Sequence, residues 1–142
     1  MSNLNAFLSQ NAIINENEKH VVSNRFRGED GKPVEWEIKP ITSKRDEELR
    51  KSCTKRVQIP GKKNQYMNHI DQEKYIGLIA VESTVYPNLH DAGLQDSYGV
   101  MGADELLKAM LLPGEYADFI QLIQSINGFE KTFEDKVDEA KN

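Results

Sequence analysis

The second half of the sequence consists of apolar segments with helical periodicity, separated by prolines and glycines. In residues 72–86 the apolar side chains cover most of the circumference of a helix, which is typical of a helix buried on all sides. Asp71 is suited to cap this helix, and Pro87 is suited to end it. We therefore expect the second half of the chain to be built around one central helix.

Three further helices are expected towards the C-terminus. Asp91 predicts the start of a short helix that closes at Gly99, and residues 102–112 predict another with its leucines on one side. Pro113 suits the first position of a last helix, and Gly128 suits a Schellman-type stop. These local signals predict helices but say nothing of how they pack.

The first half shows the alternation of a β-hairpin. Val34, Trp36 and Ile38 alternate with charged residues on one arm, residues 20–26 alternate on the other, and Asp30-Gly31 suits a tight reversal between them. Two strands are marginal in water, so a helix or a third strand must cover the tryptophan.

A polar helix and a second extended pair are expected after this hairpin. In residues 42–57, Ser43 and Asp46 have a spacing like that of a capping box. A thin apolar stripe at Leu49, Cys53 and Val57 predicts a helix that covers the hairpin. Residues 57–59 and 66–67 then predict a short extended pair around Pro60-Gly61. At the N-terminus, Leu4, Phe7 and Leu8 predict short helical turns that dock on something apolar.

The expected fold class is therefore α+β, with a small antiparallel sheet based on the N-terminal β-hairpin and a helix-rich C-terminal part. A chain of 142 residues, 38% hydrophobic and 29% charged, is typical of one folded domain. We expect residues 1–70 to hold the sheet, 71–129 the helices, and 130–142 a tail or a frayed helix. No apolar run approaches the roughly 18 residues of a membrane span, and a single cysteine fits a reducing compartment, so a cytoplasmic protein is expected.

Charge is unevenly distributed along the chain. The net charge is -5, but residues 43–63 carry eight basic and three acidic groups, while residues 71–142 carry five basic and fourteen acidic groups. The basic segment 44–63 makes a nucleic-acid-binding regulator the alternative function, although no aromatic residue stands beside its lysines and the acidic remainder would repel a polyphosphate. Nucleic acid is therefore not the expected partner.

The sequence gives little support for catalysis, a cofactor or a metal. In the segment "GVMGADEL", Asp104 and Glu105 stand where a phosphate would bind at a helix N-terminus, so Gly99 and Gly102 are better interpreted as helix stops. Cys53 has basic neighbours that would favour a thiolate, but its place late in a helix and on the apolar stripe favours a buried thiol. The three histidines have no spacing typical of metal ligands. We expect no catalytic, cofactor-binding or metal-binding residues, and therefore no enzyme.

The candidate partner-binding residues are apolar and aromatic side chains around the loops that link the last helices. They are Tyr98, Met101, Leu112, Tyr116 and Phe119. One interpretation is core packing beneath these loops. The other is a groove for a partner helix, which methionine and aromatic side chains would line.

Four segments carry a resemblance to a known family. They are "LNAFLSQNA", "GKPVEWEIKPIT", "LRKSCTKRV" and "YPNLHDAGLQDSYGVMGADELLKAMLLPGEYADFIQLIQSINGF", with Gly93 as a departure from the pattern. Over nearly its whole length the sequence resembles the XkdN-like phage tail assembly chaperones of phages and prophages of Gram-positive bacteria. The resemblance implies a non-catalytic factor that coats the long helical tape-measure protein until the tail tube polymerises around it, and that is absent from the finished virion. It has no catalytic residues to carry over, and it leaves self-association into a homo-oligomer open.

Overall fold

The computed structural model describes residues 3–14 and 16–129. The expectation for residues 130–142 lies outside this part of the chain. The elements, in chain order, are the 3-10 helix η1 (Asn3–Phe7), β1 (Glu18–His20), β2 (Trp36–Ile38), α1 (Ser43–Ser52), β3 (Thr54–Gln58), β4 (Tyr66–Ile70), α2 (Gln72–Ser83), β5 (Thr84–Tyr86), α3 (Ala92–Ser97), α4 (Ala103–Met110) and α5 (Pro113–Ile126). The α+β class is confirmed: small antiparallel sheets accompany a helix-rich second half.

A hairpin is present as predicted, but its first strand is Glu18–His20, so of the predicted arm 20–26 only His20 lies in a strand. A third strand joins the sheet. β1 pairs with β2 in antiparallel register, with His20 opposite Trp36, and Gly31 supplies the positive φ of 76° at the reversal. β5 pairs with the other edge of β2, so the strand order is β1-β2-β5. β2 is therefore a central strand, and its Trp36 and Ile38 are buried.

The predicted central helix is too long at its C-terminal end, where the structure has the strand β5 instead. The sequence predicts a helix through residue 86, but α2 ends at Ser83 and residues 84–86 are extended. Thr84 lies opposite Ile38, and the backbone N–H of Lys39 donates to the Ser83 carbonyl at 2.8 Å. The β-branched residues at 84 and 85 suit a strand once β2 is available to pair with them. The tertiary pairing therefore overrides the helical periodicity.

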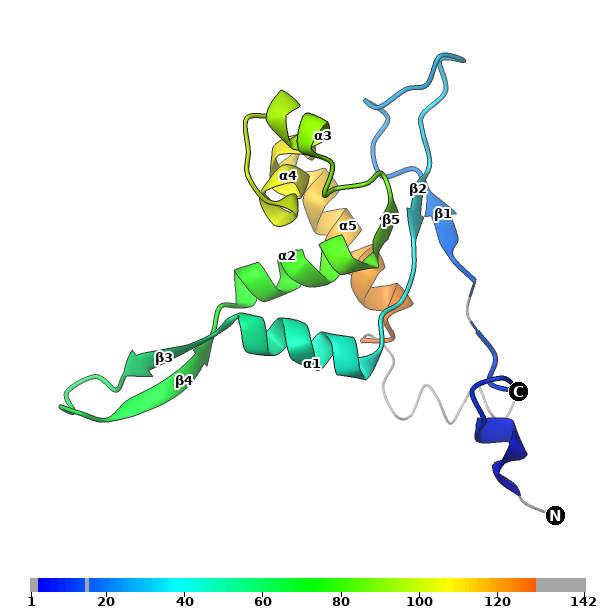
Figure 1. Ribbon diagram of the computed structural model, residues 1–142. Coiled ribbons are helices and arrows are strands. Elements are labelled where there is room, and N and C mark those ends of the chain that lie inside the picture. The colour runs from blue at the N-terminus through cyan, green and yellow to red at the C-terminus, as the bar shows by residue number, and fades with distance from the viewer. Residues whose placement is uncertain (1–2, 15, 130–142) are drawn as a thin grey trace.

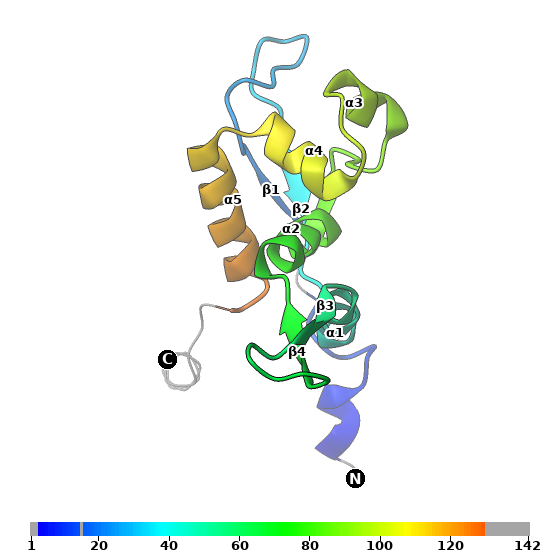
Figure 2. The same ribbon diagram turned by 90° about the vertical axis from the view of Figure 1, so that its left-hand side faces the viewer.

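α2 is the central helix, as predicted. Asp71 caps it by accepting from the backbone N–H of Lys74 at 3.2 Å. Figure 2 shows α2 nearly end-on, with α1, α4 and α5 around it, and each of these helices packs against it. The buried side chains of the core come from β2, from these four helices and from the segments next to α3 and α4. They are Trp36, Ile38, Leu49, Ile79, Ala80, Val81, Leu89, Ala103, Leu106, Leu107, Met110, Leu111, Phe119 and Ile123.

α3 and α5 begin and end where the sequence predicts, whereas α4 stops at Met110 and not at residue 112, because Leu111 and Leu112 are extended. Asp91 caps α3 by accepting from the Leu94 N–H at 2.8 Å, and Gly99 follows with a φ of 67°. α5 starts at Pro113 and stops in a Schellman motif, in which the Phe129 N–H donates to the Gln124 carbonyl at 3.0 Å.

Several details of the first half differ from the predictions. Thr42, not Ser43, is the N-cap of α1, because its hydroxyl accepts from the Arg45 N–H. α1 packs against α2 and not over the β1–β2 hairpin, and Cys53 caps its C-terminus, so Val57 already belongs to β3. The side chains of the N-terminal turn, including Phe7, remain exposed instead of docking on an apolar surface.

The second extended pair is a longer hairpin than predicted. β3 and β4 pair over five residues each, from Thr54 opposite Ile70 to Gln58 opposite Tyr66. In Figure 1 this hairpin extends beyond the N-terminal end of α2, away from the remainder of the structure. We refer to residues 54–70 as the arm.

Candidate functional site: a groove between α2 and α5

The five candidate partner-binding residues do not form one surface. Met101 is 93% exposed in the loop before α4, and Leu112 is 56% exposed in the loop after it. Tyr98 is 39% exposed, whereas Tyr116 is half-buried on α5 and Phe119 is buried. The loops around α4 thus do present apolar side chains, but Phe119 is not among them.

Phe119 belongs to the core. Its ring centroid lies 5.3 Å from that of Trp36, with the two planes at 65°, an edge-to-face arrangement that suits the quadrupoles of both rings. For this residue the core-packing interpretation is confirmed. A partner cannot reach it unless α5 moves.

A groove of about 770 Å³ lies where Tyr116 faces α2. Its apolar lining comes from two helices, α2 and α5, and from the turn between α4 and α5: Ile76, Leu111, Pro113, Tyr116, Ala117 and Ile120. Glu73, Lys108, Asp118 and Gln121 complete the lining. The groove therefore combines an apolar surface with charged and polar groups.

A second, smaller recess continues this groove along the same two helices. It measures about 190 Å³ and shares Ile76 and Ile120 with the first. From there it reaches Ile123 and, beyond the end of α5, Phe129. Together the two recesses, which we call the α2–α5 groove, follow α5 from its first residue to its stop.

Gly77 lies where α2 approaches α4 and α5 beside this groove. A Cβ at this position of α2 would stand 3.4 Å from the Asp104 Cβ and 3.7 Å from the Tyr116 hydroxyl. These are ordinary van der Waals distances, so the backbone space alone does not require glycine here. A glycine inside a helix often has a packing reason, and this one marks the place where the three helices meet.

The surroundings of the groove are acidic. Residues 71–129 include nine acidic and two basic side chains, and one of the two, Lys74, is bound to Asp104 at 2.7 Å. Burial raises the pKa of Tyr116, and the nearby carboxylates of Asp104, Glu73 and Glu105 raise it further. An approaching basic group would be attracted to this site.

An ion pair holds the N-terminal end of α5 in place. Arg25 donates to the Glu115 carboxylate at 2.6 Å and to the Met110 carbonyl at 2.7 Å. Glu115 also accepts from the Leu112 N–H at 2.8 Å, as in a capping box. The Arg25 hydrogen bond is the main reason why the pKa of Glu115 falls to about 2. These contacts link the first half of the chain to the turn that forms one end of the groove.

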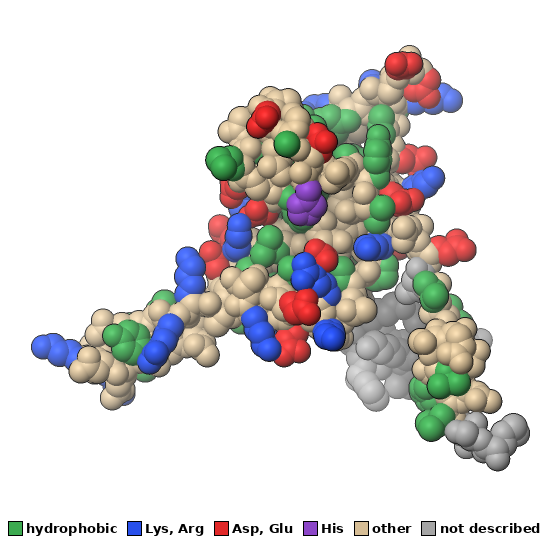
Figure 3. All heavy atoms as spheres, in the orientation of Figure 1, with side chains coloured by type: hydrophobic (Ala, Val, Ile, Leu, Met, Phe, Trp, Pro, Cys, Tyr) green, Lys and Arg blue, Asp and Glu red, His purple; other side chains and the backbone are tan. Residues whose placement is uncertain are grey.

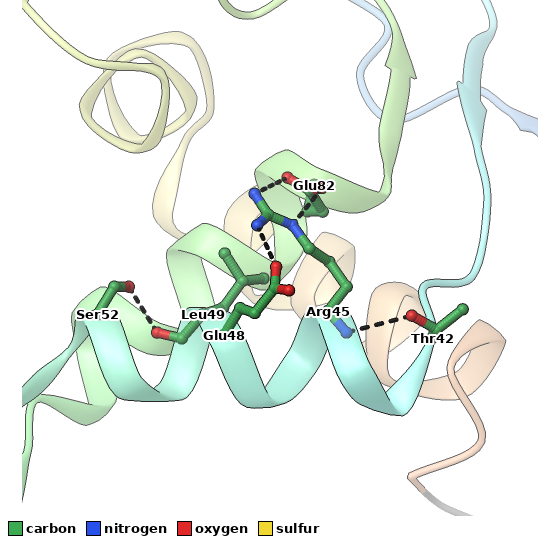
Figure 4. A network of polar contacts seen from close by, with 6 residues as sticks. All are labelled: Thr42, Arg45, Glu48, Leu49, Ser52 and Glu82. Carbon is green, nitrogen blue, oxygen red and sulfur yellow. Dashed lines mark hydrogen bonds and ion pairs between the residues drawn. The ribbon is translucent and has the colours of Figure 1, made fainter.

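In the basic segment 44–63, some basic side chains form ion pairs with carboxylates and others form none among the described residues. In α1, Arg45 donates to Glu82 of α2 at 2.7 Å and to Glu48 at 2.8 Å, as Figure 4 shows. Arg50 and Lys51 pair with acids of the same helix. Among the described residues, no salt bridge involves the four basic side chains of the arm, Lys55, Arg56, Lys62 and Lys63. In the described part of the chain, Lys44 at the start of α1 is in no salt bridge either, so the unpaired positive charge of segment 44–63 lies mostly in the arm.

An aromatic ring lies beside the positive charge of the arm. The sequence alone did not indicate this contact. The Arg56 guanidinium lies 4.7 Å from the centroid of the Tyr66 ring. The two residues are ten positions apart in the sequence, and only the pairing of β3 with β4 brings them together.

The described residues hold neither an exposed thiol nor a cluster of metal ligands. Cys53 is buried, as expected. Among residues 3–14 and 16–129, no three histidine, cysteine or acidic side chains are placed to hold a metal ion. In the same ranges no helix has the length and apolarity needed to cross a bilayer. The groove offers apolar contacts and, at Glu73, Lys108 and Asp118, charged groups.

The sequence matches one family model over residues 4–141. This model describes the phage XkdN-like tail assembly chaperone proteins. The chain belongs to this family. The family resemblance seen in the sequence is therefore confirmed, and membership favours a role without catalysis.

Two relatives from Bacillus subtilis (strain 168) extend this comparison. The phage-like element PBSX protein XkdN is 34% identical over 140 residues, which cover 98% of this chain and 93% of the relative. The uncharacterized protein YqbN is 33% identical over 140 residues, which again cover 98% of this chain and 93% of the relative. A crystal structure of the protein YqbN superposes with a TM-score of 0.76 at 29% identity, covering 92% of this chain and 99% of that one. The fold of nearly the whole chain is thus similar to that of YqbN.

Proposed function

We propose that this chaperone binds a helical segment of the phage tape-measure protein in the α2–α5 groove while the tail is assembled. The observation that carries the proposal is the groove itself, an apolar channel along α5 that is open to an amphipathic helix. Family membership supplies the process, tail assembly, and the tape-measure protein is the client that the family resemblance implies.

The chemistry of the groove also indicates the kind of helix it would bind. Ile76, Tyr116 and Ile120 would contact the apolar face of the client, and Glu73 and Asp118 would favour basic residues at its edges. Such a contact has no covalent step. It is also small enough to be reversible, as handing the client to the growing tube requires.

The site of action follows from this role. Because the client must be bound before the tube closes around it, the chaperone would act in the cytoplasm of the host bacterium and would leave before the virion is complete. Detection of the chain in purified virions at the copy number of a tube subunit would contradict this part of the proposal.

The test is co-expression with the tape-measure protein of the same phage or prophage. Ala117 is exposed and lines the groove, whereas Ala109 is exposed on α4 and does not line it. We expect Ala117→Arg to abolish the chaperone-dependent solubility of the tape-measure protein, because the side chain fills the groove. Ala109→Arg, the same change elsewhere, should leave that solubility intact. Equal solubility with both variants would refute the groove as the binding site.

The loop residues around α4 provide a second comparison. Met101 and Leu112 are exposed but do not line the groove. Charged replacements there should weaken client binding only if the client extends beyond the groove over α4.

A nucleic-acid-binding regulator is the alternative, and one observation favours it: the unpaired basic residues of the arm together with Tyr66. Binding of DNA or RNA that falls steeply with salt concentration, and that is lost when the lysines of the arm are replaced, would support this function instead.

A further inference from the structure

The hydroxyl group of Tyr116 is an unused polar group in the α2–α5 groove. Tyr116 lines the larger recess, and its hydroxyl lies against α2, 3.7 Å from the place that a Cβ of Gly77 would take. Among the described residues this hydroxyl forms no hydrogen bond. The hydroxyl of Tyr75, which lines the smaller recess, differs because it donates to Asp46 and accepts from Arg50.

A client that covers the groove must provide a partner for the Tyr116 hydroxyl. While the groove is open, water can reach this group, since Tyr116 is only half-buried. A helix that contacts Ile76 and Ile120 on the same recess would displace that water. A buried hydroxyl without a hydrogen-bond partner costs free energy, so the bound segment must bring a polar group to this point.

The charges around Tyr116 select the kind of polar group that fits. Glu73 and Asp118 line the same recess, and no salt bridge in the described part of the chain involves either of them. Burial and nearby carboxylates raise the pKa of Tyr116, so its phenol stays neutral at physiological pH. A neutral phenol oxygen beside carboxylates can accept a hydrogen bond from an ammonium or guanidinium group. Its ring can also attract that cation.

The chain itself supplies few cations to this site. Of the two basic residues in 71–129, Lys74 binds Asp104 at 2.7 Å, and Lys108 lines the same recess as Glu73 and Asp118. Figure 3 shows lysine and arginine side chains gathered on the arm, with no acidic side chain among them. No residue of the arm lines either recess. The charge of the larger recess therefore remains negative overall and favours a cation from a partner.

The face of α5 in the groove changes from polar to apolar along the helix. Tyr116, Ile120 and Ile123 are four and three residues apart, so they lie on one face of α5. Tyr116 and Ile120 line the larger recess, and Ile123 and Phe129 line the smaller one. A client helix that lies along α5 has the same rise of about 1.5 Å per residue, so its contacts repeat at the same spacing.

We propose that Tyr116 determines the specificity of the groove by accepting a hydrogen bond from a lysine or arginine on the apolar face of the client helix. Large apolar residues four and seven positions from that basic residue then cover Ile120 and Ile123. The cation lies near Glu73 and Asp118, within the apolar stripe of the client and not only at its edges. This inference rests on the proposed function, because it concerns the same groove.

Two synthetic peptides test this specificity. The first is an alanine- and glutamine-based helix with one central lysine and with leucines four and seven residues to either side, so it fits whichever way the helix runs. The second has methionine in place of the lysine, which keeps an unbranched side chain and removes the charge. Fluorescence anisotropy with the full chain measures both affinities. The lysine peptide should bind about ten times more tightly than the methionine peptide.

Tyr116→Phe removes only the hydroxyl and keeps the ring. It should weaken binding of the lysine peptide about tenfold and should not weaken binding of the methionine peptide. Tyr86→Phe is the matched control, because Tyr86 is exposed on β5 and does not line the groove. It should change neither affinity. Ala117→Arg should abolish binding of both peptides, which shows that they occupy the groove.

A double-mutant cycle tests whether Tyr116 and Glu73 bind the same cation. Glu73→Gln alone should weaken binding of the lysine peptide and leave that of the methionine peptide unchanged. Combined with Tyr116→Phe, it should cost less than the sum of the two single changes, because both act through one ammonium group. Fully additive effects would show that Tyr116 and Glu73 do not share the cation and would contradict the proposed subsite.

Three further results would overturn the proposal. The unchanged chain could bind both peptides equally. Tyr116→Phe could weaken both by the same factor, which would indicate a loss of packing alone. Neither peptide could bind, which would show that the chemistry assigned to the client is wrong.

The co-expression assay decides the proposed function separately. Loss of client solubility with Ala117→Arg, together with equal binding of the two peptides, would leave the proposed function intact and refute the role of Tyr116. Conversely, a preference for lysine that depends on Tyr116, together with no effect of Ala117→Arg on the tape-measure protein, would refute the proposed function and leave the subsite intact.

Discussion

The side chain of Trp36 on β2 meets that of Phe119 on α5 in an edge-to-face contact, with ring centroids 5.3 Å apart. Both rings are almost fully buried. Phe26 adds a third ring, 6.4 Å from the tryptophan. This contact joins the three-stranded sheet to the helix that forms one wall of the groove, so the shape of the groove depends on the packing of the sheet.

Replacing Phe119 should therefore act on stability and not directly on partner binding. We expect Phe119→Ala to lower the free energy of unfolding by about 3–5 kcal/mol, because it removes a buried ring and leaves a cavity. Met101→Ala, at an exposed position, should change it by less than about 0.5 kcal/mol. Urea denaturation of both variants measures the difference. Equal stability of the two would show that Phe119 does not support the core.

The ion pair between Lys74 and Asp104 should respond unequally to loss of either partner. The Asp104 side chain is 7% exposed and that of Lys74 is 48% exposed. Burial acts to raise the pKa of Asp104, but the hydrogen bond and charge of Lys74 outweigh it and hold the pKa below its usual value.

Lys74→Met leaves a buried carboxylate without its cation and should lower the free energy of unfolding by about 1–3 kcal/mol. Asp104→Asn leaves an ammonium group that water can reach and should have a smaller effect. Chemical denaturation at neutral pH gives the comparison, and a larger loss for Asp104→Asn would be inconsistent with this account.

The contact between Arg25 and Glu115 should make stability depend on pH in the acid range. Glu115 has a pKa of about 2 in the folded protein, against 4.5 for a free glutamate. A lowered folded-state pKa stabilises the fold above the unfolded-state pKa, and this stabilisation is lost as the pH falls from about 4.5 to 2.

Glu115→Gln should flatten the fall of stability in that pH range, because the amide does not titrate there and its oxygen still accepts from Leu112. Thermal denaturation between pH 2 and pH 6 provides the measurement. An unchanged pH profile would show that Glu115 is not paired in solution.

Cys53 should react slowly with a thiol reagent. It is 3% exposed, at the C-terminal end of α1. Labelling of the native protein should be much slower than labelling in denaturant, because it requires local opening. Labelling at the rate of the unfolded chain would indicate an accessible thiol and would revive the possibility of cysteine-dependent chemistry.

The features that the sequence predicts well are those in which a few neighbouring residues decide the backbone. Asp71 and Asp91 cap their helices, Pro113 begins α5, and Gly128 ends it in the expected motif. The α+β class follows from the same signals, since alternating periods occur in the first half of the chain and most of the helical periods in the second. Residues 84–86 escaped prediction because their conformation depends on β2, nearly fifty residues earlier.

The candidate site shows even more clearly the difference between what local sequence decides and what tertiary packing decides. The sequence places apolar and aromatic residues near the ends of α4, and the structure confirms that Met101 and Leu112 are exposed there. It cannot tell that Phe119 points to the core while Tyr116, three residues earlier on the same helix, lines a groove. That depends on the angle at which α5 packs against α2 and the sheet.

The sequence by itself determined the starts of α2, α3 and α5, the end of α5, the reversal of the first hairpin, the uneven distribution of charge and the family. Each of these depends on the side chains themselves or on backbone contacts only a few residues apart. Only the tertiary structure decided that a third strand completes the sheet, that the α2–α5 groove exists and that the arm stands apart from it. These depend on contacts between distant segments, whose geometry is set by the packing of all the helices together.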